Sequence, residues 1–262
     1  MKTIILLLFL TLMLSCQKHN VEVGDYQDST ITIFGEITSQ QKIQFIKAVK
    51  NSGINEYSDI LVDNAQVTIF NSTNVYHHTY SNNGFYLSDS LYSLTPNNIY
   101  SFKLTANDSI YQSEFVMPTP IIITDIITNK IEDFNTNKLS INVNYTNSTF
   151  FITDIFKGKI DTVLQDTSWV LHTTTPKIYD CTASNLVVIL SEDENLILED
   201  YNLVKVVVKS LSYKTADYFK KLYDYRQNIS TTNQYVNPPK NYFKNAYGCV
   251  YGTYISTFIK AL

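Results

Sequence analysis

The sequence predicts a mostly β protein, in which an amino-terminal Ig-like β-sandwich precedes a second antiparallel β domain, barrel- or sandwich-like, with one α-helix. Composition is the first reason: the 262 residues include 20 Tyr and 14 Phe but 7 Gly and 6 Pro, as is typical of strands joined by polar turns. The second is that short segments alternate apolar and polar residues, which places the apolar ones on one face of a strand. The third is that one segment, near 212–227, has a helical period.

The first domain is expected over residues 30–116, as a series of short strands. They are expected at 31–37, 66–70, 74–80, 99–106 and 109–115. In the first of them, alternate residues share one face: Ile31, Ile33, Gly35 and Ile37. Asn107-Asp108 predicts a tight turn, so the last two strands should form a hairpin.

Two prolines in "MPTP" predict a linker at 117–121, because proline favours extended, donor-poor backbone. The second domain is then expected over 122–262. Its strands are expected at 138–145, 149–156, 159–165, 185–190 and 202–211, with a turn at Lys157-Gly158 and a last long strand near the carboxyl end. Ser212 is the expected N-cap of the helix at about 212–227, and Asp217 with Lys221 is an expected i,i+4 pair.

The amino terminus has the layout of an exported lipoprotein. Lys2 precedes an apolar run that is too short to span a bilayer, so residues 1–15 are predicted to be a cleaved signal. The tetrapeptide "MLSC" resembles the lipobox of bacterial lipoproteins, which implies that Cys16 receives a diacylglycerol and further acyl chains such as palmitate. A multiply acylated Cys16 anchors the chain to a membrane, and residues 16–29 form a tether. The alternative is an ordinary cleaved signal.

If Cys16 is lipidated, the remaining cysteines are Cys181 and Cys249, an even number in an oxidising compartment. Two alternatives stay open from the sequence. The pair forms a disulfide, or both are free, buried or half-buried thiols.

Charge and motifs exclude several classes of function. The net charge is −4 and the basic residues are scattered, which argues against a nucleic-acid partner. The sequence contains no nucleophile elbow, phosphate loop, dinucleotide fingerprint or zinc helix, so no catalytic, cofactor-binding or metal-binding residue is predicted and no cofactor is expected.

Three local features have a structural and a functional interpretation. Adjacent His77 and His78 point to opposite faces of a strand, so one exposed and one packed histidine is favoured over a metal site. The acidic run "SEDEN" (191–195) is interpreted as a solvated turn. Trp169, the one tryptophan, is either a core anchor, which is favoured, or a stacking platform.

Several phrases in order resemble a family of exported Bacteroidetes lipoproteins of unknown function. The phrases are "FGEIT", "VDNAQVTIFN", "NGFY", "IYSFKLTANDSIYQSEF", "MPTPIIITDI", "TDIFKGKI" and "NPPKNYFKNAYGCVYGTYIS". The resemblance implies a carboxypeptidase-regulatory or transthyretin-like first domain, carried by Ala65, Val67 and Ile69, by Gly84 and Tyr86, and by Tyr100, Phe102 and Leu104. It supplies no catalytic residues.

Members of that family are typically encoded beside TonB-dependent receptors. The resemblance therefore implies a non-enzymatic accessory component of an outer-membrane uptake system, with a receptor β-barrel as partner. The alternative is a structural or adhesive envelope lipoprotein. The run Gln17 to Asn20 lacks the acidic residues that usually follow the cysteine of surface-exposed members, so the sequence leaves the inner and outer faces of the outer membrane open.

Overall fold

The structure is a computed structural model of the chain. It describes residues 31–50, 60–131, 136–145, 150–161, 166–172, 178–180, 186–189, 201–232, 242–243 and 245–262. The predicted signal, the tether, Cys16, Cys181 and "SEDEN" lie outside these ranges. Within them, no helix is both long and apolar enough to cross a bilayer.

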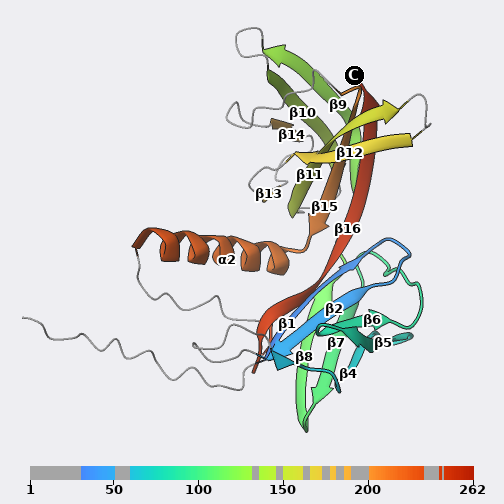
Figure 1. Cartoon of the computed structure of the whole chain (residues 1–262), viewed down its shortest axis with the longest axis vertical. Helices are drawn as coiled ribbons and strands as arrows, with labels where there is room; N and C mark the ends of the chain where they lie inside the picture. Colours follow the sequence, from blue (N-terminus) through green and yellow to red (C-terminus); the bar gives the residue numbers. More distant parts are fainter. Residues whose placement is uncertain are drawn as a thin grey trace, which may run out of the picture.

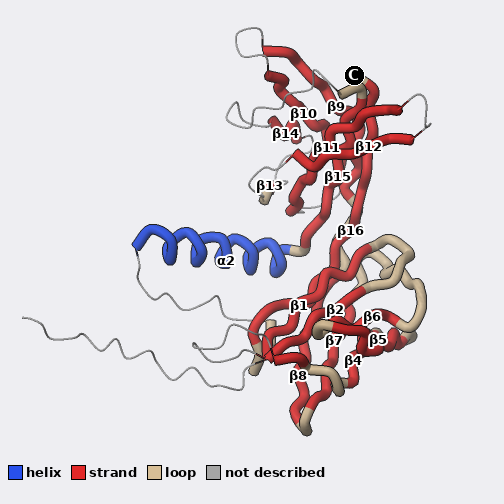
Figure 2. Tube along the Cα trace, in the orientation of Figure 1, coloured by secondary structure: helices blue, strands red, loops and turns tan. Residues whose placement is uncertain are grey.

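Strands make up most of the described chain, with one helix beside them (Figures 1 and 2). The first strands are β1 (Ile31–Thr38), β2 (Phe45–Lys50), β3 (Ile60–Leu61), β4 (Gln66–Phe70), β5 (Val75–Asn82), β6 (Phe85–Ser88), β7 (Ile99–Ala106) and β8 (Ser109–Val116). They are followed by β9 (Ile121–Ile131), β10 (Thr136–Tyr145), β11 (Phe150–Asp161), β12 (Asp166–His172), β13 (Tyr179–Asp180), β14 (Leu186–Ile189), β15 (Leu203–Leu211), helix α2 (Tyr213–Thr232) and β16 (Tyr247–Ala261).

The last strand, β16, joins two lobes into one sheet (Figure 1). Its first half pairs in parallel with β1, from Thr32 opposite Tyr247 to Thr38 opposite Thr253. Its second half pairs antiparallel with β15, up to Leu203 opposite Ala261. The sheet order is β12-β11-β15-β16-β1-β2-β6-β5-β4-β7-β8, with β13 beside β11 and β3 beside β2.

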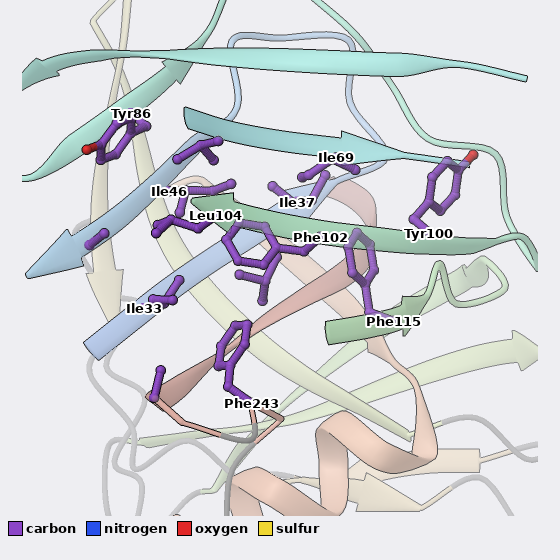
Figure 3. Close-up of a cluster of buried hydrophobic side chains, with 14 of the residues drawn as sticks. Ile33, Ile37, Ile46, Ile69, Tyr86, Tyr100, Phe102, Leu104, Phe115 and Phe243 are labelled. Carbon is purple, nitrogen blue, oxygen red and sulfur yellow. The ribbon is translucent and has the colours of Figure 1, made fainter. Parts of the chain in front are cut away.

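The first lobe consists of β1 to β8 and the first half of β16, packed around a core of alternate strand residues. The predicted inner face of β1 is confirmed, because Ile31, Ile33 and Ile37 are buried in this core. Figure 3 shows their neighbours from several strands converging on the same interior: Ile46, Ile69, Tyr86, Tyr100, Phe102, Leu104, Phe115 and Phe243. The predicted hairpin is also confirmed, since β7 and β8 pair around Asn107 and Asp108, which have φ values of 47° and 61°.

The second lobe consists of β9 to β15 and the second half of β16. A three-stranded sheet, β14-β10-β9, faces β11, β15 and β16 across a core of branched aliphatic residues. The core side chains include Ile121, Ile126, Leu139, Ile141, Phe151, Ile155, Val204, Val206 and Val208. Among the described strands this lobe is an open sandwich and no barrel closes, which selects one of the two predicted shapes.

The predicted turn at Lys157-Gly158 is wrong. β11 runs without interruption through both residues, and the described register with β12 continues from Ile155 to Asp161. The sequence pattern also misses β2, in which Ile46, Ala48 and Val49 are all buried. Adjacent buried residues obscure the alternation that marks a half-buried strand.

The domain boundaries predicted at 30–116, 117–121 and 122–262 need correction. Met117 is completely buried in the first-lobe core, so the segment expected as a proline linker begins inside that core. Residues 247–253 belong to the first lobe through their pairing with β1. The carboxyl-terminal segment is therefore divided between the two lobes and does not belong to the second domain alone.

Helix α2 leaves the sheet where the two lobes meet and projects sideways (Figure 1). The predicted cap is confirmed: the Thr215 backbone N–H donates to Ser212 Oγ at 3.3 Å, and Ala216 N–H to the Ser212 carbonyl at 2.9 Å. The predicted pair of Asp217 and Lys221 is also present, with 2.6 Å between Oδ2 and Nζ. The helix reaches Thr232, beyond the predicted 227.

Candidate interaction surface

Of the two cysteines that could form a disulfide, the structure describes Cys249 alone, so their pairing stays a prediction. Cys249 on β16 is a free thiol and is completely buried, while Cys181 lies outside the described residues. Its neighbours are apolar and aromatic, and burial raises the pKa of the Cys249 thiol far above its ordinary range. Cys249 is therefore a packed, unreactive side chain in this structure.

The two histidines on β5 behave as the packing interpretation predicts. His77 is exposed and His78 is buried, with its Nε2 3.2 Å from the Tyr92 hydroxyl. Burial lowers the pKa of His78 to about 4, so the ring is neutral at physiological pH. Across the described residues, no three His, Cys, Asp or Glu side chains gather as metal ligands would.

The surface that stands out lies on the outside of the large sheet, opposite the second-lobe core. On β15 the inner positions Val204, Val206 and Val208 are buried, so the alternate residues point outward. Their cross-strand partners on β11 and β16 share that side. We call this side the outer face.

Apolar side chains gather on the outer face of the second lobe. We define the upper patch as Phe156, Ile160, Trp169, Leu171 and Ile259, together with Lys205. Three of these are well exposed: Ile160 at 42%, Leu171 at 48% and Ile259 at 53%. These neighbouring exposed side chains make this part of the sheet a candidate interaction surface.

Trp169 is a surface residue and not the favoured core anchor. It is half-buried, and its six-membered ring lies against Gly158 on the neighbouring strand. Lys205 reaches the same place from the other side of β11, with Nζ 4.4 Å from the Trp169 ring centroid and 4.3 Å from that of Phe156. The two rings therefore hold one ammonium group between them.

Lys209, four residues further along β15 on the same side of the strand, has a different environment. Its Nζ lies 3.5 Å from a Glu36 oxygen and 3.5 Å from an Asp154 oxygen. Lys205 has no carboxylate within ion-pair distance among the described residues. Of these two outward lysines of β15, one is neutralised by carboxylates and the other is held by two aromatic rings.

A second apolar region, the lower patch, lies on the outside of the first lobe. It consists of Phe34, Phe45, Phe85 and Leu87. Its exposed members are less open than those of the upper patch, at 39% for Phe34 and Phe45 and 38% for Leu87. Phe45 and Phe85 also contact each other edge to face, with their centroids 6.0 Å apart.

Helix α2 covers the outer face between the two patches. Its Ala216 and Tyr218 pack with Cys249 and Tyr251 of β16 and with Leu211 of β15. The helix therefore divides the outer face into two separate apolar regions.

The upper patch was not predicted, although a signal for it exists in the sequence. In "LVKVVVKSL" (203–211) both alternating sets contain apolar residues. Such a strand is either covered on both sides or exposes an apolar face, and the sequence does not distinguish these. In the structure the outer side is partly exposed from Leu203 to Lys209, and helix α2 covers it at Leu211.

No family model and no curated protein sequence matches this chain. Among solved structures it is similar to the FN1–FN3 domains of chicken CNTN1, with 13% identity and a TM-score of 0.28, over 69% of this chain and 60% of that one. It is also similar to a DUF3823 family protein from Bacteroides ovatus, with 11% identity and a TM-score of 0.17, over 71% of this chain and 92% of that one. Both likenesses are too weak to bear on function.

Proposed function

We propose that the chain is a lipid-anchored lipoprotein of the outer membrane that acts as a non-enzymatic binding component. Its partner is the β-barrel of a TonB-dependent receptor, and its role is accessory to uptake. The lipobox at Cys16 and the family resemblance of the sequence support the anchor and the partner.

The observation that carries the proposal is the open outer face of the second lobe. Both lobes already have closed apolar cores of their own, so the upper patch is not needed to complete the fold. Exposed aliphatic side chains around a fixed lysine fit a protein partner, because such contacts combine apolar burial with a charge that sets orientation.

The position of the patch fits an anchored protein. The tether precedes Ile31 in the sequence, and β1 begins beside the start of β16. The upper patch lies beside the other end of β16, which has 15 residues and is thus about 50 Å long. An anchor at Cys16 therefore enters the folded chain at the opposite end of β16 from the patch.

Extraction of the native protein in mild detergent tests the proposal. The wild-type chain should retain a receptor β-barrel in stoichiometric amount, and a Cys16→Ala variant should lose its lipid label and its membrane fraction. A lipidated chain that never retains a β-barrel contradicts the uptake role. That result would favour a structural or adhesive envelope lipoprotein.

A further inference from the structure

The upper patch has one charge at its centre, and this charge indicates the chemistry of the partner. We propose that the partner protein binds through the upper patch and places a carboxylate against Lys205. This inference rests on the proposed function, because it assigns a surface and a complementary charge to the same interaction.

The two outward lysines of β15 differ in how their charges are balanced. Lys209 already contacts two carboxylates, Glu36 and Asp154, each at 3.5 Å. The Lys205 ammonium lies over the faces of Phe156 and Trp169 and has no carboxylate within ion-pair distance among the described residues. Of these two lysines, Lys205 is the one whose charge remains to be balanced.

When a partner buries the Lys205 ammonium, its positive charge needs a carboxylate beside it. A partner that covers Ile160, Leu171 and Ile259 also removes water from the Lys205 ammonium, which lies among them on the same face. Removing water from an unpaired ammonium is costly, whereas a charged hydrogen bond to a carboxylate offsets that cost. An apolar partner surface with an acidic side chain at its centre therefore fits, and a purely apolar or basic one does not.

The lysine is also prepared for such a contact. The Phe156 and Trp169 rings hold its ammonium group and so restrict its rotamers before the partner arrives. Less side-chain entropy is then lost on binding. Gly158 contributes by leaving room for the Trp169 ring against β11.

The lower patch fits this role less well. Phe34 contacts Tyr251 of β16 edge to face at 5.8 Å, and Phe45 contacts Phe85 at 6.0 Å. The Lys47 ammonium lies 5.8 Å from the Phe85 centroid, further than Lys205 lies from either of its two rings. The exposed side chains of the lower patch are also less open than those of the upper patch. Partner burial there removes less hydrocarbon from water.

Site-specific photo-crosslinking in living cells tests the surface on the full-length, lipidated chain. A photoreactive phenylalanine analogue replaces Leu171 or Ile259 in the upper patch. Matched positions are Leu87 in the lower patch and Ile122 on the outside of β9, which is 59% exposed. Mass spectrometry identifies the linked protein.

Crosslinks to a TonB-dependent β-barrel from Leu171 and Ile259, and not from Ile122, are expected. Crosslinks to that barrel from Leu87 alone would contradict binding through the upper patch, but they would still support the proposed function. The absence of any β-barrel at all four positions, with a lipidated and folded chain, would overturn both.

Substitutions of Lys205 test the charge, with the crosslinked β-barrel purified in detergent micelles as the probe. Lys205→Glu should weaken binding about tenfold or more, and Lys205→Met should weaken it less and flatten its dependence on salt. The control is Lys159→Glu, an equal charge change at an exposed residue on the opposite side of β11. Circular dichroism verifies that each variant is folded. Equal affinity of Lys205→Glu and wild type, or an equal loss in Lys159→Glu, would overturn the proposal.

Discussion

Gly158 and Trp169 lie opposite each other on neighbouring strands, and the indole occupies the space that a side chain at position 158 would fill. They are direct cross-strand partners of β11 and β12. A Cβ atom at position 158 would lie 2.5 Å from Cζ3 of Trp169, closer than real Cβ contacts. The glycine therefore admits the indole to the outer face, and it does not form a turn.

Gly158→Val should displace Trp169 from β11. Overpacking of this kind typically costs about 1–3 kcal/mol of unfolding free energy. Trp169 is the one tryptophan of the chain, so its emission should shift to longer wavelength as the ring moves into water. Urea unfolding monitored by circular dichroism and by tryptophan emission measures both effects.

The matched control is Trp169→Ala, alone and combined with Gly158→Val. The valine should cost much less stability in the Trp169→Ala background, because the clash is removed. Equal costs in both backgrounds would contradict the fit of the two residues.

Burial of His78 should make the protein less stable in mild acid. Its pKa in the folded state is lowered to about 4 from 6.5, because the ring is removed from water. The unfolded chain binds the proton on His78 more tightly than the folded chain does. The stability that comes from neutral, buried His78 is therefore fully present above pH 6.5 and is lost as the pH decreases towards 4. The loss amounts to roughly 3 kcal/mol at most.

Unfolding free energies measured by urea denaturation from pH 4 to pH 7.5 test this dependence. His78→Phe should remove much of the slope in this interval, whereas His77→Ala, at the exposed neighbour, should keep it. A slope unchanged by His78→Phe would show that another group is responsible.

The sequence predicts the first lobe better than the second, for a physical reason. The hairpin of β7 and β8 rests on local chemistry, since Asn107 and Asp108 tolerate the left-handed backbone that its turn requires. Exposure of the outer face depends on which side of β15, a strand with apolar residues on both sides, is packed against other elements. That is decided by other parts of the chain, so the pattern within 203–211 does not contain it.

The pairing of β16 with β1 was unpredictable for a related reason. The Thr253 hydroxyl donates a hydrogen bond to the Glu36 carboxylate, 217 positions away in the sequence. A local sequence pattern does not identify so distant a partner. Gly248 and Gly252 of β16 lack a side chain and so permit bends or close backbone approach. In the structure both meet the first lobe, with Gly248 against Ile33 and Gly252 against Met117.

Gly248→Ala should strongly destabilise the first lobe. Gly248 has a φ of +96°, and a Cβ there would lie 2.0 Å from the carbonyl oxygen of Ile33. A side chain would therefore strain the backbone and separate β16 from β1, at a cost of about 2 kcal/mol or more. Thermal unfolding measures the loss.

The comparison variant for Gly248→Ala is Gly35→Ala on β1. A Cβ at Gly35 meets the Ile46 side chain at 3.0 Å, and its φ is not in the left-handed region. A smaller loss is expected there, because a side chain yields more readily than backbone. An equal or larger loss at Gly35 would contradict the importance of the Gly248 conformation.

Cys249 should remain a free thiol in the folded protein lacking residues 1–16. Burial and the raised pKa keep the thiolate population negligible, so a thiol reagent should label Cys249 only after denaturation. A reducing agent should leave the unfolding midpoint unchanged, and Cys181→Ser should behave like the parent. If Cys249 instead paired with Cys181, reduction would lower stability by roughly 3–5 kcal/mol and Cys181→Ser would reproduce that loss. Thermal unfolding with and without reductant distinguishes these outcomes.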